Sequence, residues 1–127
     1  MTAIARFRTT VIDCPDPLGL ARFYAAVLDW PVSVADDTWV VVSDGGPPAR
    51  LAFQRADDYV APAWPDPKRP QQFHLDLTVE DLDEGEAQVL RLGATKPGHQ
   101  PSDDGSFRVF LDPAGHPFCL CVGEPTS

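Results

Sequence analysis

Basic residues are scarce in this chain. The sequence has 10 Lys and Arg against 19 Asp and Glu in 127 residues, and its formal net charge is −9 at pH 7. Proteins that bind nucleic acid or anionic membrane surfaces rely on clustered Lys and Arg side chains. The composition therefore argues against both kinds of partner.

Long apolar runs are missing as well. The longest ones, such as Trp39 to Val42, fall far short of the roughly 20 residues that a membrane helix needs. No charged and then apolar signal peptide opens the chain. We expect a soluble cytoplasmic protein. The length and the 43% of hydrophobic residues suit one domain with one core.

Cysteine is rare, and its spacing excludes two kinds of site. Cys14, Cys119 and Cys121 are odd in number and lack the C-x-x-C spacing of structural zinc sites and redox motifs, so we expect reduced thiols. A phosphate-binding glycine loop is also absent, because the glycines at 45 and 46 do not precede a helix. The sequence supplies no oxyanion hole for nucleophilic hydrolysis either.

The first half of the chain predicts the order βαβββ. β-Branched residues over 5–13 predict a strand, and Asp16 is a natural N-cap for a helix that ends before Asp29. Apolar residues at helical spacing indicate that one face of this helix packs on the core. Turn-type clusters then separate three short strands, at residues 32–35, 38–42 and 49–55.

The second half predicts the same order after a proline-rich connector at 57–71. Residues 72–79 alternate strictly between apolar and polar, which is typical of a strand with one face on the core. Asp81 caps the following helix and Gly93 ends it. Three further strands are predicted at residues 94–96, 106–111 and 116–122, the last two joined by an Asp-Pro-Ala-Gly turn.

An offset of 65 residues superposes the two halves. It pairs the helix caps Asp16 and Asp81, and it pairs Thr9 with His74 and Gln54 with Cys119. We therefore expect an α+β fold of tandem βαβββ modules, with a concave mixed sheet around a cavity and helices on the outer face. The single domain spans 1–127, with its parts at about 4–56 (module 1), 57–71 (connector) and about 72–123 (module 2).

Three motifs carry a resemblance to a known superfamily. They are the D-P…F-Y…L start of the first helix, F-H-L-D-L-T-V-E-D-L at 73–82 and F-L-D-P-A-G-H-P-F-C-L at 110–120. With the element order, they resemble the vicinal oxygen chelate superfamily, in particular its glyoxalase-like and bleomycin-resistance-like proteins. The resemblance implies the glyoxalase/bleomycin resistance/dihydroxybiphenyl dioxygenase fold and a homodimer.

The resemblance also implies where a metal would sit. Family members hold a divalent ion with one residue from the first and one from the fourth strand of each module, here Thr9, Gln54, His74 and Cys119. Only His74 is a usual ligand, since Thr9 is a poor neutral donor and Gln54 offers only a carbonyl oxygen. A Cys119 thiolate would favour Zn over Fe, Mn or Ni, and Asp76 could substitute as a ligand. We therefore favour no metal, with a divalent ion as the alternative.

Several side chains are candidates for function. His74 and Asp76 share the polar face of one strand and could act as a general acid and base, or form a merely structural pair. Arg108 could hold a ligand carboxylate or phosphate, Trp64 could lie across a cavity mouth, and His99 and His116 are expected to face solvent. The predicted ligand-binding residues are Thr9, Val11, Trp39, Gln54, His74, Arg108, Phe110 and Cys119.

These features favour a protein that binds a small organic molecule in a concave cavity without a catalytic metal, as sequestration or resistance proteins of the superfamily do. An enzyme of the same fold is the first alternative. It would be either a metal-dependent lyase or ring-cleaving dioxygenase, or a metal-free acid–base enzyme that uses His74 and Asp76. A protein-interaction module that uses the sheet edges is a further alternative.

Overall fold

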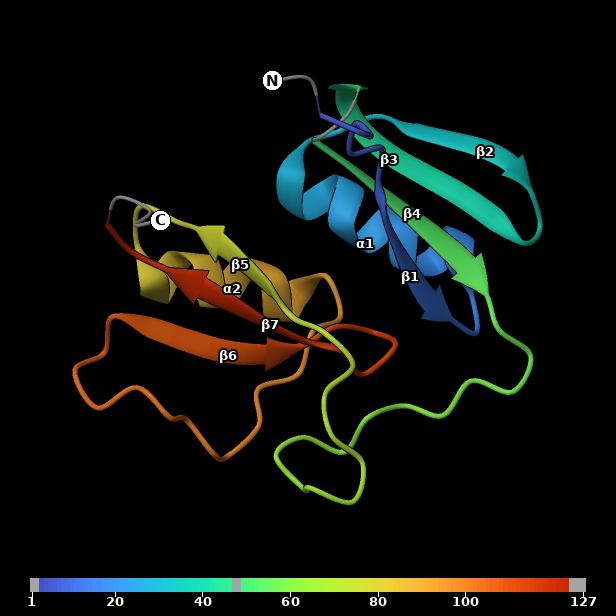
Figure 1. The fold of residues 1–127 in the computed structure, drawn as a ribbon. Coiled ribbons are helices and arrows are strands. Elements are labelled where there is room, and N and C mark those ends of the chain that lie inside the picture. Colours follow the sequence, from blue (N-terminus) through green and yellow to red (C-terminus); the bar gives the residue numbers. More distant parts are fainter. Residues whose placement is uncertain (1–2, 47–48, 124–127) are drawn as a thin grey trace. The chain divides into compact units, whose positions relative to one another are not determined.

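The computed structural model describes residues 3–46 and 49–123 (Figure 1). Tertiary contacts divide the chain into two compact units, Met1–Tyr59 and Val60–Ser127, which we call the N-terminal unit and the C-terminal unit. The division falls inside the predicted connector. Neither described helix is long and apolar enough to cross a membrane.

The N-terminal unit is one four-stranded sheet with one helix. Its strands lie in the order β1-β4-β3-β2, and β1 runs parallel to β4 while the other neighbours are antiparallel. The elements are β1 (Thr10–Cys14), α1 (Pro17–Leu28), β2 (Val32–Asp36), β3 (Trp39–Gly46) and β4 (Ala49–Arg55). All four predicted strands and the predicted helix are present.

Helix α1 covers one face of this sheet because its buried side chains meet the buried face of β4. The Tyr24 ring stacks on Phe53 with 5.8 Å between centroids, and both side chains are fully buried. The Asp16 side chain accepts a hydrogen bond from the Gly19 N–H at 3.1 Å, as expected of an N-cap. Since strand residues alternate between faces, Ala52 and Gln54 lie on the face turned away from α1.

Strand β1 begins later than the predicted 5–13. The ladder pairs Thr10 with Leu51, and β4 begins at Ala49. Residues before Arg8 would therefore extend past the end of the neighbouring strand, where their backbone groups have no ladder partner. The β-branched composition predicted the strand, but the length of its neighbour sets where it starts.

The C-terminal unit is a three-stranded sheet in the order β5-β7-β6, with β5 parallel to β7 and β6 antiparallel to it. Its elements are β5 (Leu75–Thr78), α2 (Leu82–Arg91), β6 (Phe107–Leu111) and β7 (Pro117–Cys121). The Asp81 carboxylate accepts the Glu84 N–H at 3.1 Å, and Gly93 ends the helix with a positive φ of 113°. Both helix signals of the sequence are therefore confirmed.

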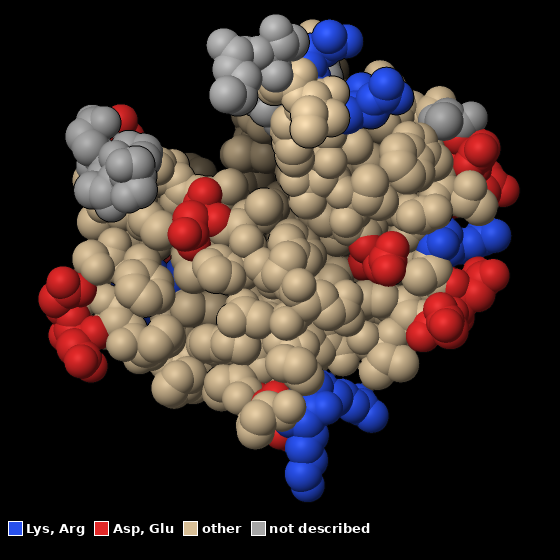
Figure 2. Space-filling model, in the orientation of Figure 1, with Lys and Arg blue, Asp and Glu red and all other residues tan. Residues whose placement is uncertain are grey.

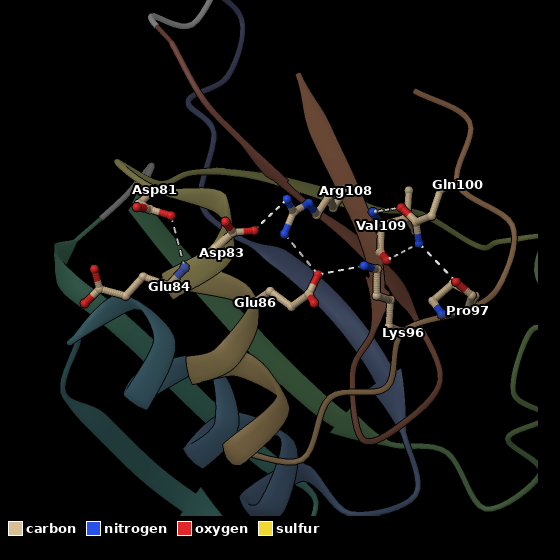
Figure 3. A network of polar contacts seen from close by, with 9 residues as sticks. All are labelled: Asp81, Asp83, Glu84, Glu86, Lys96, Pro97, Gln100, Arg108 and Val109. Atoms are coloured by element: carbon tan, nitrogen blue, oxygen red, sulfur yellow. Dashed lines mark hydrogen bonds and ion pairs between the residues drawn. The ribbon is translucent and has the colours of Figure 1, made fainter. Parts of the chain in front are cut away.

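The strand predicted at 94–96 is wrong. Only an isolated bridge joins Thr95 to Leu111, with hydrogen bonds of 2.9 and 2.8 Å. Pro97 follows at once and has no N–H to continue a ladder. The side-chain amide of Gln100 replaces the missing strand, since it accepts the Val109 N–H at 2.8 Å and donates to the Val109 carbonyl at 2.9 Å (Figure 3).

The fold class is confirmed. The chain is α+β, with two open mixed sheets and, among the described residues, one helix in each unit (Figure 1). The parallel pairing of the first and last strand recurs in both units, as the repeat in the sequence predicts. The core of the C-terminal unit includes Phe110 and Phe118, whose rings stack at 5.8 Å.

The face drawn in Figure 2 carries scattered acidic and basic side chains on a mostly uncharged surface, and at the right edge the two kinds lie next to each other. A continuous basic surface, which would neutralise a phosphate backbone, is not seen in this view. The exclusion of nucleic acid as a partner stays a prediction.

Replacing Gln100 by Leu should lower the free energy of unfolding by about 1–2 kcal/mol, because both backbone groups of Val109 lose their amide partner. Urea unfolding followed by circular dichroism measures the loss. The control is Gln88→Leu at an exposed helical position, where the two residues have similar helix propensity. Equal stabilities of the two variants would show that the Gln100 amide does not support the sheet.

Candidate functional site

Strands β5 and β7 bring three chemically active side chains together in the C-terminal unit. The predicted alternation is observed: Leu75 and Leu77 are half-buried, while His74 and Asp76 are exposed. The parallel ladder sets Asp76 directly beside Cys119, so both side chains lie on one face of the sheet. His74 shares that face because it is two residues from Asp76.

The three side chains form a compact cluster. The Nε2 atom of His74 lies 3.4 Å from Oδ1 of Asp76, and the two side chains are 44% and 65% exposed. The donor atoms of His74, Asp76 and Cys119 all lie within 4.8 Å of one another. An imidazole beside a carboxylate can be oriented by it and can transfer a proton to a bound molecule.

The Cys119 side chain is held in its neutral form. Burial, the neighbouring Asp76 carboxylate and Cys121 together raise the pKa of this thiol from 9.0 to about 12. Burial comes first because an anion loses its hydration in the sheet interior, and the negative Asp76 then opposes a second charge beside it. The pKa of Cys121 is raised for the same two reasons. Without a bound metal, Cys119 is therefore a thiol rather than a thiolate at neutral pH.

The cluster would have to rearrange to hold a divalent metal. A tetrahedral site with bonds of 2.0–2.3 Å would place neighbouring donors roughly 3.3–3.8 Å apart. The three donor atoms here spread over as much as 4.8 Å, and one of them belongs to the protonated Cys119 thiol. Binding an ion would require both a closer arrangement and the loss of that proton.

The two family ligand positions of the N-terminal unit do not meet. Thr9 lies just before β1, and its hydroxyl donates to the Arg50 carbonyl at 3.3 Å. Gln54 is exposed and pairs in register with Asp13 and Trp39. Thr9 is thus level with Arg50, four residues from Gln54 along β4, or about 13 Å at 3.3 Å per residue.

Arg108 and Phe110 lie on the opposite face of their sheet from the one that the sequence predicts. The ladders pair Arg108 with Leu120 and Phe110 with Phe118, whereas Cys119 pairs with Val109. Arg108 donates to Asp83 at 2.8 Å and to Glu86 at 3.2 Å, both on helix α2 (Figure 3). Helix carboxylates draw this guanidinium to the helix side, and Phe110 is fully buried there.

His116 is buried, so the prediction that it faces solvent is wrong. Its ring lies 4.8 Å from the Phe73 ring, and its backbone N–H donates to the buried Asp112 carboxylate at 3.0 Å. His99 is exposed as predicted, and its ring lies 5.4 Å from that of Trp64. A role for Trp64 at a cavity mouth stays a prediction.

The N-terminal unit contains an open pocket of about 650 Å³. The ladders place Ser33, Trp39, Val41, Ser43 and Arg50 on one sheet face, the face turned away from α1. Val11 lies on the same face beside Ala52 and is 43% exposed. The lining residues are Pro31, Ser33, Val34, Trp39, Val41, Ser43, Asp44, Gly45 and Arg50.

Of the residues that line this pocket, sequence reasoning predicted only Trp39 as ligand-binding. It gave the anion-binding role to Arg108, which lies on the helix face of the other sheet. Strand alternation contained a usable signal, since Trp39, Val41 and Ser43 lie at every second position of β3. The contribution of Ser33 depends on the register between β2 and β3, which alternation alone does not determine.

Comparison with models of known protein families identifies the family of this chain. The family model of the glyoxalase-like domain matches residues 9–121, which is most of the chain. The chain belongs to the glyoxalase-like domain family. No curated protein matches this glyoxalase-like chain in sequence.

Solved structures share the fold at low sequence identity. A glyoxalase/bleomycin resistance protein/dioxygenase family enzyme from Burkholderia phytofirmans superposes with a TM-score of 0.70 at 15% identity, covering 93% of this chain and 98% of that one. The fosfomycin resistance protein FosX from Mesorhizobium loti superposes with a TM-score of 0.65 at 18% identity, covering 97% of this chain and 95% of that one. The bleomycin-binding protein from Streptomyces verticillus, solved with copper(II)-bleomycin, superposes with a TM-score of 0.59 at 18% identity, covering 98% of this chain and 100% of that one. These likenesses place the chain in the glyoxalase/bleomycin resistance fold.

Cys119 should react slowly with iodoacetamide in the native protein. With a pKa of about 12, the thiolate fraction at pH 8 is about 1 in 10⁴, and alkylation should accelerate about tenfold per pH unit while the protein stays folded. Asp76→Asn should speed the reaction, because removal of the neighbouring negative charge lowers the thiol pKa. Peptide mass spectrometry measures the rate. Alkylation as fast as in urea-unfolded protein would contradict a neutral, buried Cys119.

Glu86→Gln should lower the free energy of unfolding by about 1 kcal/mol at pH 7. The hydrogen bond from Lys96, reinforced by Arg108, holds the Glu86 pKa below its ordinary value of 4.5. A lowered folded-state pKa contributes stability above pH 4.5, and this contribution is lost as the pH falls through the folded-state value.

Urea denaturation at pH 7 and pH 3 tests this pH dependence, with the exposed Glu80→Gln as control. The control should change stability by less than about 0.5 kcal/mol at either pH. If Glu86→Gln lost as much stability at pH 3 as at pH 7, the effect would come from packing and not from the ionised carboxylate.

Proposed function

We propose that this glyoxalase-like protein binds a small organic molecule without a catalytic metal, as a sequestration or resistance protein. The pocket of the N-terminal unit is the observation that carries the proposal. Its volume of about 650 Å³ lies within the range of small-molecule sites, roughly 300–1,000 Å³.

The lining of the pocket has the composition of a ligand site. Trp39, Val41 and Pro31 supply apolar and aromatic surface, while Ser33 and Arg50 supply a few polar groups that can orient a ligand. Among the proteins of the same fold, one is described as bleomycin-binding and another as a fosfomycin resistance protein. Their descriptions support a binding or resistance role for this chain as well.

The absence of a catalytic metal is part of the proposal and rests on the donor set. Thr9 and Gln54 are weak neutral donors that lie about 13 Å apart along the ladder. In the C-terminal unit, the donor atoms of His74, Asp76 and Cys119 are up to 4.8 Å apart, and an ion would have to displace the Cys119 proton. A metal-dependent lyase or dioxygenase would require these groups to rearrange.

The His74–Asp76 pair favours one alternative function. With 3.4 Å between Nε2 and Oδ1 and both side chains exposed, the carboxylate can orient the imidazole toward a bound molecule. Such a pair could move a proton in a metal-free isomerisation or elimination. The second candidate is therefore an acid–base enzyme, in which His74 accepts the proton and Asp76 positions its ring.

A thermal-shift screen of chelator-treated protein against a library of aromatic and polycyclic compounds tests the binding function. At least one compound should raise Tm without added metal. Ser33→Trp should abolish the shift, because the exposed Ser33 lines the pocket and an indole would fill it. Leu90→Trp is the matched control, since it places the same ring on an exposed position of α2 and should leave the shift intact.

The same protein separates the alternatives. A stoichiometric metal in elemental analysis, needed for every thermal shift, would overturn the metal-free proposal. Turnover of a bound compound that His74→Ala abolishes, with folding and binding unchanged, would favour the acid–base enzyme. No hit in the full library would count against small-molecule binding. The homodimer that the family resemblance implies is tested by size-exclusion chromatography with light scattering.

A further inference from the structure

Arg50 differs from the other arginines whose contacts are described. Arg108 is paired with Asp83 and Glu86, and Arg55 with Asp57. Within residues 3–46 and 49–123, by contrast, no ion pair joins Arg50 to a carboxylate, although its side chain lines the pocket. The pocket therefore contains a cation that the described part of the chain does not neutralise.

The guanidinium of Arg50 also has an unsatisfied donor. Its Nε atom is buried and makes no hydrogen bond within the described part of the chain. A buried donor without a partner destabilises the folded protein, and more so when the group is charged. Buried polar groups are otherwise almost always paired, so this exception marks Arg50, whose side chain lines the pocket, as the group best placed to anchor a ligand.

The geometry of a guanidinium selects the complementary group. Its N–H donors form a planar fork that matches the two oxygens of a carboxylate. A phosphate would also match the fork, but it would bring up to two negative charges into a chain of net charge −9, beside Asp44 in the same lining. A single carboxylate charge gains the Arg50 hydrogen bonds with less repulsion.

The rest of the pocket selects the body of the ligand. Arg50 pairs with Ser43 across the ladder, and Val41 and Trp39 follow on the same face at two-residue steps of about 7 Å. A ligand held at Arg50 by one end therefore extends over Val41 toward the Trp39 indole. Flat apolar rings stack well on indole, so an aromatic ring suits this stretch of the wall.

We propose that the pocket of the N-terminal unit binds a small aromatic monocarboxylate, with its carboxylate at Arg50 and its ring against Val41 and Trp39. This inference rests on the proposed small-molecule binding function and names the chemical class of the ligand. The Ser33 and Ser43 hydroxyls lie in the same lining and can hydrogen-bond ring substituents.

The experiment uses two probes of nearly equal shape, 1-naphthoate and the neutral 1-naphthamide, with the full-length protein. Calorimetric titration should show naphthoate binding at least tenfold more tightly than naphthamide. In ¹H–¹⁵N spectra, the Nε–H signal of Arg50, assigned by its loss in Arg50→Lys, should move downfield with naphthoate only.

Variants separate recognition of the carboxylate by Arg50 from recognition of the ring by Trp39. Arg50→Gln should bring the ratio of the naphthoate and naphthamide affinities to about 1. Trp39→Ala should instead lower the affinity for both probes by a similar factor. Arg55→Gln is the matched control, because Arg55 lies on the same strand but outside the pocket lining, paired with Asp57. It should leave the preference unchanged. Should Arg50→Gln fail to fold, Arg50→Lys replaces it and should lose most of the preference, because an ammonium lacks the planar fork.

Each other outcome overturns the inference. Equal affinities for naphthoate and naphthamide, or a preference that survives Arg50→Gln, would remove the carboxylate from Arg50 while leaving small-molecule binding intact. Tighter binding of 1-naphthylphosphonate than of naphthoate would make the pocket a phosphonate or phosphate site. If neither naphthyl probe bound but library compounds did, only the ligand class would be wrong. If the library also gave no hits, the binding function would fail with it.

Discussion

The register between neighbouring strands is the constraint on which both candidate sites depend. The parallel β5–β7 ladder sets Asp76 beside Cys119 in one sheet, and the antiparallel β3–β4 ladder sets Ser43 beside Arg50 in the other. Once that register is set, alternation assigns every further side chain to the helix face or to the open face. A shift of one residue would move Cys119 and Arg50 into contact with their helices and would remove both sites.

The two open faces have different chemistry even though the units repeat one pattern. The open face of the C-terminal unit holds a carboxylate, an imidazole and a neutral thiol in close contact, and these groups favour proton transfer or polar contacts. The open face of the N-terminal unit holds a cation with no ion pair among the described residues, an indole and two hydroxyls around a pocket, and these groups favour binding. The repeat thus provides one scaffold for two kinds of surface.

Features of the fold that depend on neighbouring residues could be predicted from the sequence, whereas many features of the sites could not. The caps Asp16 and Asp81 and the alternation around His74 are local, and each is found as predicted. The face of Arg108 depends on carboxylates more than 20 residues away on α2. The burial of His116 likewise depends on the distant Phe73 ring. The pocket arises only when three strands are placed in register, so periodicity within one strand could not reveal it.

Gln100 has a further consequence for the solubility of the protein. A strand at the edge of a sheet presents free N–H and carbonyl groups, to which a strand from another molecule can add. The Gln100 amide occupies both groups of Val109 with a side chain, which has no backbone to extend the sheet. One residue in an irregular segment thus occupies an edge position of β6 and hinders its pairing there with a strand from another molecule.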